Sequence, residues 1–343
     1  MHTLDPKPRV QQPKLTAILP CKGNAPMVKE CLDSLADQTT DQPYEVILVD
    51  GWMDEPLAEL ARSYDFVCLI RSDDNLLQAE ARNLAAQHAN SEYLAFIDSD
   101  CVADRGWVAG AIAALDSGVR LAGGPVVDHY PDRLICVADN YSQFAELPAT
   151  RPAGVQDHFP ACNIAVRKDD FFKAGGFPRT GVPAAEDTLF CYSMSDQHGP
   201  ESLQFRPEMK VAHRGRETLK AFLDHQRFFG SVRGMFGLKL DERKRRLGRY
   251  TVMGIPASLM RARFMLTRTA KWAPKRLWTV LKISPLMVWG MVHFSRGFRD
   301  ACREPLVEAR PAFNPDGTAA TDANPPTTTA STDPAPVPTA APA

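Results

Sequence analysis

The sequence predicts an α/β protein with a mostly parallel central sheet, followed by a basic helical extension. One observation is that short apolar runs alternate with amphipathic segments between residues 15 and 98, a pattern typical of parallel sheets covered by helices. The other is the distribution of charge. Residues 243–299 contain 14 Lys and Arg and no Asp or Glu, although the net charge of the whole chain is only −1. The body of the protein is therefore acidic, and one segment is strongly basic.

The composition indicates two domains, or one large domain with appendages. The 343 residues are 44% hydrophobic and 24% charged, which argues against wholesale disorder, collagen and a polytopic membrane protein. The eight cysteines are scattered without a CxxC pair, which predicts reduced thiols and neither disulfides nor a zinc ribbon. Residues 1–14 are polar with three prolines. We therefore expect a flexible N-terminus, no signal peptide and a cytosolic protein.

The predicted elements follow in order from residue 15. Residues 15–20 form the first strand, and after Asn24 one apolar face predicts a helix, made by Met27, Val28, Cys31, Leu32 and Leu35. Further buried strands are expected at 44–50, 66–70 and 93–98, with amphipathic helices at 55–64 and 78–89 between them. Beyond residue 119 the pattern is less regular. It shows apparent strands at 119–127 and 162–168 and a helix from about 186, which we assign to the same domain.

Residues 236–310 are predicted to form a basic amphipathic helical region. Trp272, Trp278 and Trp289 lie there among cationic and aliphatic residues, as in helices that bind anionic membrane surfaces. The alternative is an ordinary extension packed on the body with its basic face in solvent. The longest uncharged run, residues 283–295, has 13 residues, fewer than the ~20 needed to span a bilayer. We expect peripheral or monotopic attachment, and the tryptophans favour lipid over nucleic acid as the partner.

The last segment, residues 311–343, is predicted to be a disordered tail. It contains eight prolines together with many Ala and Thr. A segment of this composition has too few large apolar side chains to build a core of its own.

Polar residues follow three predicted strands at their carboxyl ends, where sheets of this kind bind ligands. They are Pro20-Cys21-Lys22, Asp50-Gly51 and Asp98-Ser99-Asp100. One such aspartate is often only a helix cap, but three clusters at one edge favour a ligand site. Asp98 and Asp100 share one side of an extended segment. Paired carboxylates suit Mg²⁺ or Mn²⁺ bound together with a diphosphate, and a solvated turn is the alternative.

Five motifs together resemble the family 2 glycosyltransferases of the GT-A fold. In chain order they are LTAILPCKGN, VILVDG, AEARNLAAQHANSEYLAFIDSD, CNIAVRKDDFFKAGGF and AAEDTLF. The resemblance covers residues 15–235 and implies a non-processive enzyme of the bacterial type. Such an enzyme transfers a sugar with inversion from a UDP- or GDP-sugar to a glycan or lipid-linked acceptor. It would serve polysaccharide, lipopolysaccharide or glycolipid synthesis at the cytoplasmic face of the cell membrane.

The resemblance also implies a role for each motif residue. Pro20, Lys22, Asp50, Arg82 and Asp98 would bind the nucleotide-sugar, Asp100 with Asp98 would bind the metal, and Glu186 and Asp187 would be catalytic. Asp187 is the expected base. His213, in VAHRGR, is a further candidate for the metal or the diphosphate.

The chemistry requires similar groups whatever the family. The acceptor hydroxyl loses its proton as it attacks, which needs a positioned carboxylate, and the leaving diphosphate needs a metal to offset its charge. At a helix start, Glu186 and Asp187 could instead serve only the helix dipole. Two other functions stay open. A non-catalytic nucleotide-sugar-binding module would not need a base, and a sugar-nucleotide nucleotidyltransferase would need a glycine-rich loop that PCKGNAPM does not supply.

Overall fold

The computed structural model describes residues 2–4, 10–238, 248–250, 254–314 and 316–320. Its main sheet has nine strands in the order β1-β4-β3-β2-β5-β10-β7-β11-β9. The central four are parallel to one another: β4 (Val67–Ser72), β3 (Tyr44–Asp50), β2 (Leu15–Cys21) and β5 (Tyr93–Ile97). The outer strands make antiparallel pairs as well, so the sheet is mixed, and its parallel part is the part that the alternating pattern predicted.

Helices connect the parallel strands, as predicted: α1 (Ala25–Ala36), α2 (Glu55–Arg62) and α3 (Gln78–His88). The expected apolar face of α1 is buried, with Val28, Cys31, Leu32 and Leu35 fully inaccessible. The side chain of Asn24 caps the helix by accepting a hydrogen bond from the Met27 amide. The register places Cys21 beside Asp50 and Asp50 beside Arg71. The carboxyl ends of β2, β3 and β4 therefore meet at one edge.

The second half of the domain completes this sheet and adds a small one. Its elements are α4 (Trp107–Asp116), β7 (Leu121–Gly123), β9 (Gly154–Val155), β10 (Asn163–Arg167), α6 (Lys168–Lys173), α7 (Glu186–His198), η1 (Pro200–Ser202) and β11 (Leu203–Phe205). The small sheet has the order β6 (Cys101–Ala103), β12 (Val211–His213) and β8 (Val126–Asp128). Its register places Cys101, His213 and Asp128 in one row.

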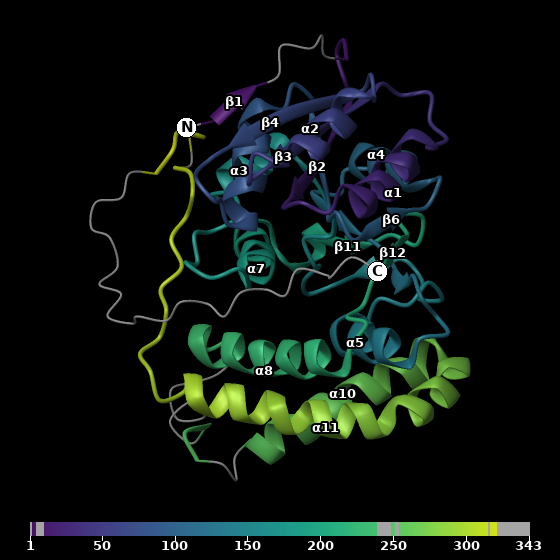
Figure 1. Cartoon of the computed structure of the whole chain (residues 1–343), viewed down its shortest axis with the longest axis vertical. Coiled ribbons are helices and arrows are strands. Elements are labelled where there is room, and N and C mark those ends of the chain that lie inside the picture. The colour runs from purple at the N-terminus through teal and green to yellow at the C-terminus, as the bar shows by residue number, and fades with distance from the viewer. Residues whose placement is uncertain (1, 5–9, 239–247, 251–253, 315, 321–343) are drawn as a thin grey trace.

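A layer of helices lies beneath the α/β domain in Figure 1. It consists of α5 (Leu134–Phe144), α8 (Leu219–Phe236), α10 (Gly254–Trp272), the short η3 (Pro274–Arg276) and α11 (Leu277–Ala301). The axes of α8 and α11 approach closely because each helix contributes a glycine that packs against the backbone of the other. A Cβ on Gly230 would lie 1.9 Å from the Phe294 oxygen, and a Cβ on Gly297 would lie 1.9 Å from the Arg227 oxygen. The boundary predicted at residue 236 therefore falls at the end of a helix that packs with the extension.

The N-terminus differs from the prediction of a flexible segment over residues 1–14. Residues His2–Leu4 form β1 and pair antiparallel with β4. The Lys14 amide donates to the Pro43 oxygen, and its ammonium pairs with Glu92 at 2.7 Å. Sequence patterns miss so short a strand because it has no apolar face of its own. Backbone pairing with the existing edge of the sheet holds it in place. Residues 1 and 5–9 lie outside the described part.

The predicted disordered tail is wrong for residues 311–314 and 316–320. In Figure 1 the chain leaves α11 and climbs the side of the molecule as a yellow segment, which we call the C-terminal strap (residues 303–314 and 316–320). Backbone hydrogen bonds join Arg310 to Arg179. Phe313 is 4% exposed, and the centre of its ring lies 4.9 Å from that of the Phe172 ring. A Cβ on Gly176 would lie 2.6 Å from the Phe313 ring. One aromatic residue thus orders a segment whose average composition suggests disorder. Residues 315 and 321–343 lie outside the described part.

Candidate active site

The nucleotide-binding candidates lie together after β2 and β3. Lys22 Nζ donates to Asn75 Oδ1 at 2.8 Å, and Trp52 Nε1 donates to the same oxygen at 3.1 Å. Burial lowers the pKa of Lys22, and Trp52 is 53% exposed beside it. Pro20 is buried within β2, in register with Val49. This edge therefore presents one ammonium group and one accessible aromatic ring.

Asp50 is the most enclosed of these candidates. Its side chain is fully buried, and its Oδ1 accepts a hydrogen bond from the Trp52 amide at 3.0 Å. Its Oδ2 makes no hydrogen bond within the described residues, although Arg71 Nε lies 3.5 Å away. A buried carboxylate oxygen without a hydrogen bond is costly. The Oδ2 atom of Asp50 is therefore available to accept a hydrogen bond from a bound ligand.

Three predicted site residues form one ionic cluster. Arg82 on α3 donates to Asp98 Oδ1 at 2.5 Å and to Glu186 Oε1 at 2.9 Å, and its side chain is 1% exposed. Burial, with the adjacent Asp187 charge, raises the pKa of Glu186 to about 7, and Arg82 opposes this rise. Arg82 thus joins the end of β5 to the start of α7 and holds Asp98 in a fixed orientation.

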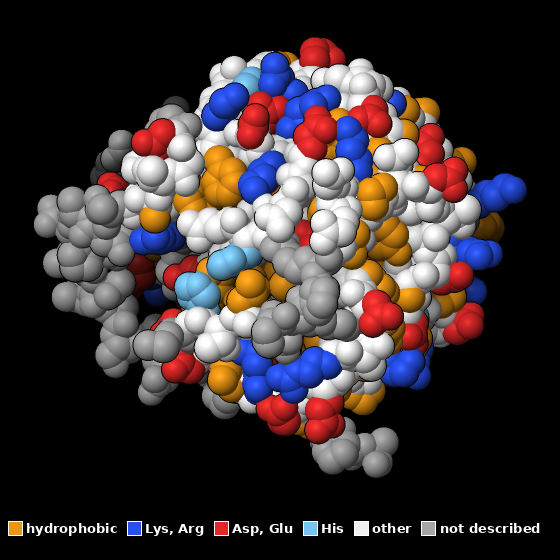
Figure 2. All heavy atoms as spheres, turned by 90° about the horizontal axis from the view of Figure 1, so that it is seen from above, with side chains coloured by type: hydrophobic (Ala, Val, Ile, Leu, Met, Phe, Trp, Pro, Cys, Tyr) orange, Lys and Arg blue, Asp and Glu red, His pale blue; other side chains and the backbone are white. Residues whose placement is uncertain are grey.

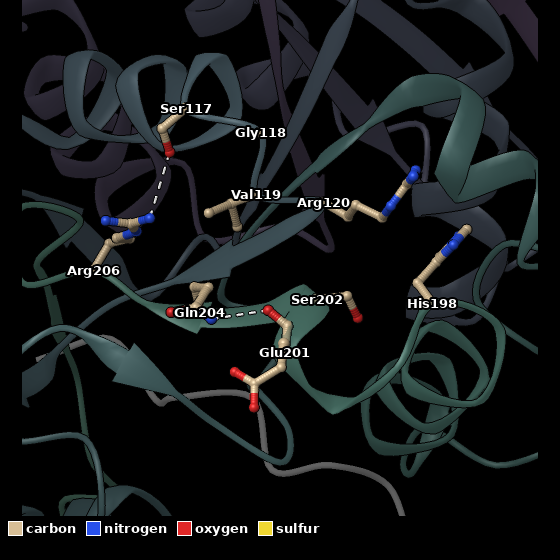
Figure 3. A pocket seen from close by; sticks show the side chains of 9 residues that line it. All are labelled: Ser117, Gly118, Val119, Arg120, His198, Glu201, Ser202, Gln204 and Arg206. Atoms are coloured by element: carbon tan, nitrogen blue, oxygen red, sulfur yellow. Dashed lines mark hydrogen bonds between the residues drawn. The ribbon is translucent and has the colours of Figure 1, made fainter.

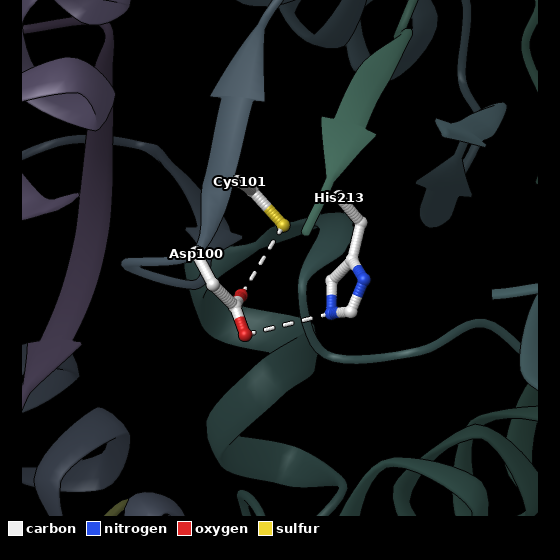
Figure 4. A group of neighbouring side chains, drawn as sticks. All are labelled: Asp100, Cys101 and His213. Carbon is white, nitrogen blue, oxygen red and sulfur yellow. Dashed lines mark hydrogen bonds and ion pairs between the residues drawn. The ribbon is translucent and has the colours of Figure 1, made fainter. Parts of the chain in front are cut away.

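Asp100 faces a different partner. Its Oδ2 lies 3.5 Å from His213 Nε2, and Cys101 Sγ is 3.7 Å from its Oδ1 (Figure 4). The other ring nitrogen of His213, Nδ1, contacts Asn140 Oδ1 at 2.8 Å, while the Asn140 amide donates to the His213 oxygen. This arrangement places a proton on Nδ1 and turns Nε2 toward Asp100.

The donor set near Asp100 fits a divalent metal. Ligand atoms of Asp100, Cys101 and His213 lie within 4.8 Å of one another. Burial raises the pKa of the Cys101 thiol well above its usual value, so the neutral sulfur is a poor ligand. One carboxylate and one imidazole remain, with substrate oxygens and water to complete the shell, and this set suits Mn²⁺ or Mg²⁺. Asn140 supplies the outer hydrogen bond that orients such a histidine.

Asp187 lies in the first turn of α7. Its Oδ1 accepts the Thr188 amide hydrogen at 2.6 Å, and its Oδ2 accepts that of Ala161 at 3.2 Å. Its neighbour Glu186 shares the Arg82 guanidinium with Asp98. Asp187 is therefore a partly exposed carboxylate close to the Asp98-Ser99-Asp100 segment, which is where a base would be required.

Comparisons with known proteins show what this chain is similar to in sequence and in fold. The profile of the family described as Glycosyl transferase family 2 matches residues 16–172. This segment, slightly less than half of the chain, is similar to the family 2 glycosyltransferases. The chain is 27% identical to the glycosyltransferase AglE of Haloferax volcanii over 172 residues, which cover 48% of this chain and 56% of AglE. It is 23% identical to a pre-mycofactocin glycosyltransferase of Mycobacterium tuberculosis, over 63% of this chain and 46% of that protein. The chain thus spans about half the length of these relatives.

A solved structure shows that the family 2 domain has the GT-A fold. It is the mannosyltransferase PcManGT from Pyrobaculum calidifontis, in complex with GDP-Man and Mn²⁺. The match has a TM-score of 0.52 at 18% identity and covers 84% of this chain and 88% of that one. The expected α/β fold is therefore confirmed, and the individual site residues remain predictions.

Sequence reasoning about the family 2 motifs missed several residues that build the site. Arg71 is the second-last residue of β4 and pairs with Asp50, and the rule applied to the other strand ends could have found it. Asn75, which accepts from both Lys22 and Trp52, lies in a loop without a motif. Asn140 lies on α5 and reaches His213 from 73 positions away. No local pattern predicts a contact at that separation.

A cavity of about 480 Å³ lies away from the family 2 site (Figure 3). Its lining includes Ser117 and Arg120, which precede β7, and His198 and Ser202, which precede β11. Because β7 and β11 run parallel to β5, this cavity opens at the edge opposite Asp98. None of the predicted site residues lines it.

The raised pKa of Glu186 predicts a pH dependence of stability. The carboxyl group has a pKa near 4.5 when unfolded and about 7 when folded, so the folded state binds more protons between these values. Its contribution to the free energy of unfolding should therefore fall as the pH rises from about 4.5 to about 7. Glu186→Gln should remove this part of the slope. Urea denaturation at pH 5 and pH 8 gives the change in the free energy of unfolding between the two pH values. An equal change for the wild type and for Glu186→Gln would contradict the prediction.

Proposed function

We propose that this chain is a metal-dependent, inverting glycosyltransferase that moves a sugar from a nucleoside-diphosphate sugar to a hydroxyl acceptor. The observation that carries the proposal is that Arg82 joins Asp98, which follows β5, to Glu186, the neighbour of Asp187. Asp50 and Lys22 lie at the carboxyl ends of β3 and β2 in the same parallel part of the sheet. The complex of the PcManGT neighbour with GDP-Man and Mn²⁺ supports a nucleotide-sugar donor and a divalent metal.

Each residue has a distinct task in this proposal. Asp50 and Lys22, with the exposed ring of Trp52, bind the nucleotide. Asp187 removes the proton from the acceptor hydroxyl as it attacks, on the face of the sugar opposite the leaving group, which gives inversion. Arg82 holds Asp98 and Glu186 in place without touching the acceptor. A Mg²⁺ or Mn²⁺ held by Asp100 and His213 would offset the charge of the departing diphosphate.

The experiment is to incubate purified protein with a panel of UDP- and GDP-sugars, with and without Mn²⁺, and with glycan and lipid-linked acceptors. Metal-dependent release of UDP or GDP, and a product of inverted anomeric configuration by NMR, support the proposal. Donor binding without turnover for any acceptor in the panel would favour a non-catalytic nucleotide-sugar-binding module. Synthesis of a sugar nucleotide with release of pyrophosphate would favour a nucleotidyltransferase.

We further propose that α11 attaches the enzyme to an anionic membrane at its cytoplasmic face, where a lipid-linked or membrane-borne glycan acceptor is made. The outer face of α11 is exposed and apolar, with Trp278, Leu281, Val288, Trp289 and Val292. Its opposite face packs inward through residues such as Ile283, Met287 and Phe294. Figure 2, which views the other end of the molecule, shows Lys and Arg interspersed with Asp and Glu.

The charges around this stripe suit a lipid surface. Lys271, Lys275 and Lys282 are exposed, and none of them pairs with a carboxylate in the described part of the chain. The segment Pro274–Ala301 has 28 residues and a mean hydropathy of 1.3 in its best window, so its length and composition would also allow it to cross a membrane. The uncharged run over residues 283–295 is shorter than this helix because Lys282 precedes it. Basic residues near an anionic surface contribute about 1 kcal/mol each.

Trp278→Glu combined with Trp289→Glu should abolish or sharply reduce flotation with vesicles rich in anionic lipid at low salt. Trp278 is 75% exposed and Trp289 is 49% exposed, so the fold should tolerate both changes. Leu4→Glu, which places one glutamate at a 43% exposed apolar position on β1, is the control for each single change and should float like the wild type. Equal flotation of the double variant would show that α11 is only a packed extension.

A further inference from the structure

The corner between α10 and α11 (residues 269–276) is seated directly on the catalytic domain. Thr269 Oγ1 lies 2.9 Å from the Tyr141 hydroxyl, and the guanidinium of Arg151 stacks 4.2 Å from the Trp272 ring. Arg276 donates to Asp128 Oδ2 at 2.6 Å. The segment that precedes the exposed face of α11 thus ends in a charge-assisted contact with the small sheet of the active site.

Asp128 occupies a special position in that sheet. It pairs in register with His213, which in turn pairs with Cys101, so the three residues form one row across β8, β12 and β6. Residues in one row project their side chains to the same face. Asp128 therefore lies beside His213, the proposed metal ligand, on the neighbouring strand β8. The Asp128 side chain is only 13% exposed.

Asn140 holds His213 through two hydrogen bonds. Its amide oxygen accepts from His213 Nδ1 at 2.8 Å, and its nitrogen donates to the His213 backbone oxygen at 2.8 Å. Burial raises the pKa of the Asp128 carboxyl group, and the nearby Arg276, Asn140 and His213 oppose this rise. Arg276 therefore contacts Asp128, which lies beside His213 in the sheet, and Asn140 holds the imidazole whose Nε2 faces Asp100 at 3.5 Å.

We propose that Arg276 is a positioning residue for the metal site and orients His213 through Asp128 and Asn140. The inference rests on the proposed metal at Asp100 and His213 and adds a residue from the helical extension to it. Without Arg276, Asp128 is a largely buried carboxylate that lacks its cationic partner, an arrangement that strongly destabilises its surroundings. Asn140 and His213 then reorient toward that charge, and the imidazole no longer points at the metal position.

The test measures Mn²⁺ binding without nucleotide, by electron paramagnetic resonance of the free ion. Arg276→Gln should weaken Mn²⁺ affinity about 10- to 100-fold, the usual cost of losing an outer partner of a metal ligand. Lys275→Gln is the matched control, because it removes the same charge from the adjacent exposed residue of η3, and should bind like the wild type. With a working donor, Arg276→Gln should raise the Mn²⁺ concentration for half-maximal rate and leave the donor KM at saturating Mn²⁺ unchanged.

A second variant separates positioning from a loss of folding. Asp128→Asn with Arg276→Gln leaves no buried charge and allows a neutral hydrogen bond, so it should recover part of the lost affinity. Wild-type affinity in Arg276→Gln, equal losses in both single-cation variants, or no recovery in the double variant would overturn the inference. Asp100→Asn in the same assay reports on the metal site alone. If it binds like the wild type, the proposed metal site has failed, independently of Arg276.

Discussion

Asp187→Asn is expected to lower the rate of sugar transfer by about 100-fold or more while donor binding is retained. A general base contributes about 10²–10⁴-fold, and the amide cannot take up the acceptor proton. Its oxygen can still accept a backbone hydrogen bond of the kind that Asp187 accepts from Thr188 and Ala161, so the first turn of α7 should keep its geometry. Single-turnover transfer and donor affinity, measured separately, test the expectation.

The matched control is Asp196→Asn, which makes the same change at an exposed position of the same helix. It should leave the transfer rate unchanged. If Asp187→Asn instead abolished donor binding and left single-turnover transfer normal, Asp187 would be a binding residue and the assignment of the base would be wrong.

Asp100→Ala should remove metal-stimulated turnover, also by about 100-fold or more. The variant deletes the carboxylate that faces His213, and with it the charge compensation that a divalent metal gives to a leaving diphosphate. The side chain is 25% exposed and follows a strand end, so the fold should persist. Turnover as a function of Mn²⁺ concentration, together with circular dichroism, measures both effects.

Asp104→Ala is the control for this variant. Asp104 lies four residues further along and pairs with Lys210 at 2.6 Å, with a side chain that is 42% exposed. Its loss should not change the metal response. Normal turnover of a correctly folded Asp100→Ala protein would exclude Asp100 as an essential metal ligand.

The sequence predicts the part of the fold whose signals are local. Buried runs such as YEVILVD become strands over the predicted residues, and the spacing of Val28, Cys31, Leu32 and Leu35 identifies the buried face of α1. The same local logic brings Asp50 and Asp98 to one sheet edge, because parallel strands share the direction of their carboxyl ends. The roles of these residues remain predictions.

Contacts between distant segments could not be predicted in this way. Arg276 meets Asp128 across 148 positions, and Asn140 meets His213 across 73. These pairs depend on how the helical layer sits on the small sheet, which hydrophobic periodicity does not encode. Phe313 is a similar case, since a single aromatic residue in a Pro- and Ala-rich segment leaves no periodic signal.

The C-terminal strap changes what the helical layer is in mechanical terms. A body joined to its neighbour at one end can pivot, whereas a body held at two separated points turns only about the line between them. The corner at Arg276 is one such point, and the return of the chain to Gly175 through Phe313 is the other. We therefore expect the α/β domain to follow a tilt that a lipid surface imposes on α11 about any axis other than this line. A protein shortened at residue 240 would lose both points of contact and the buried Phe313 side chain together. Point substitutions on α11 are therefore the cleaner way to study attachment.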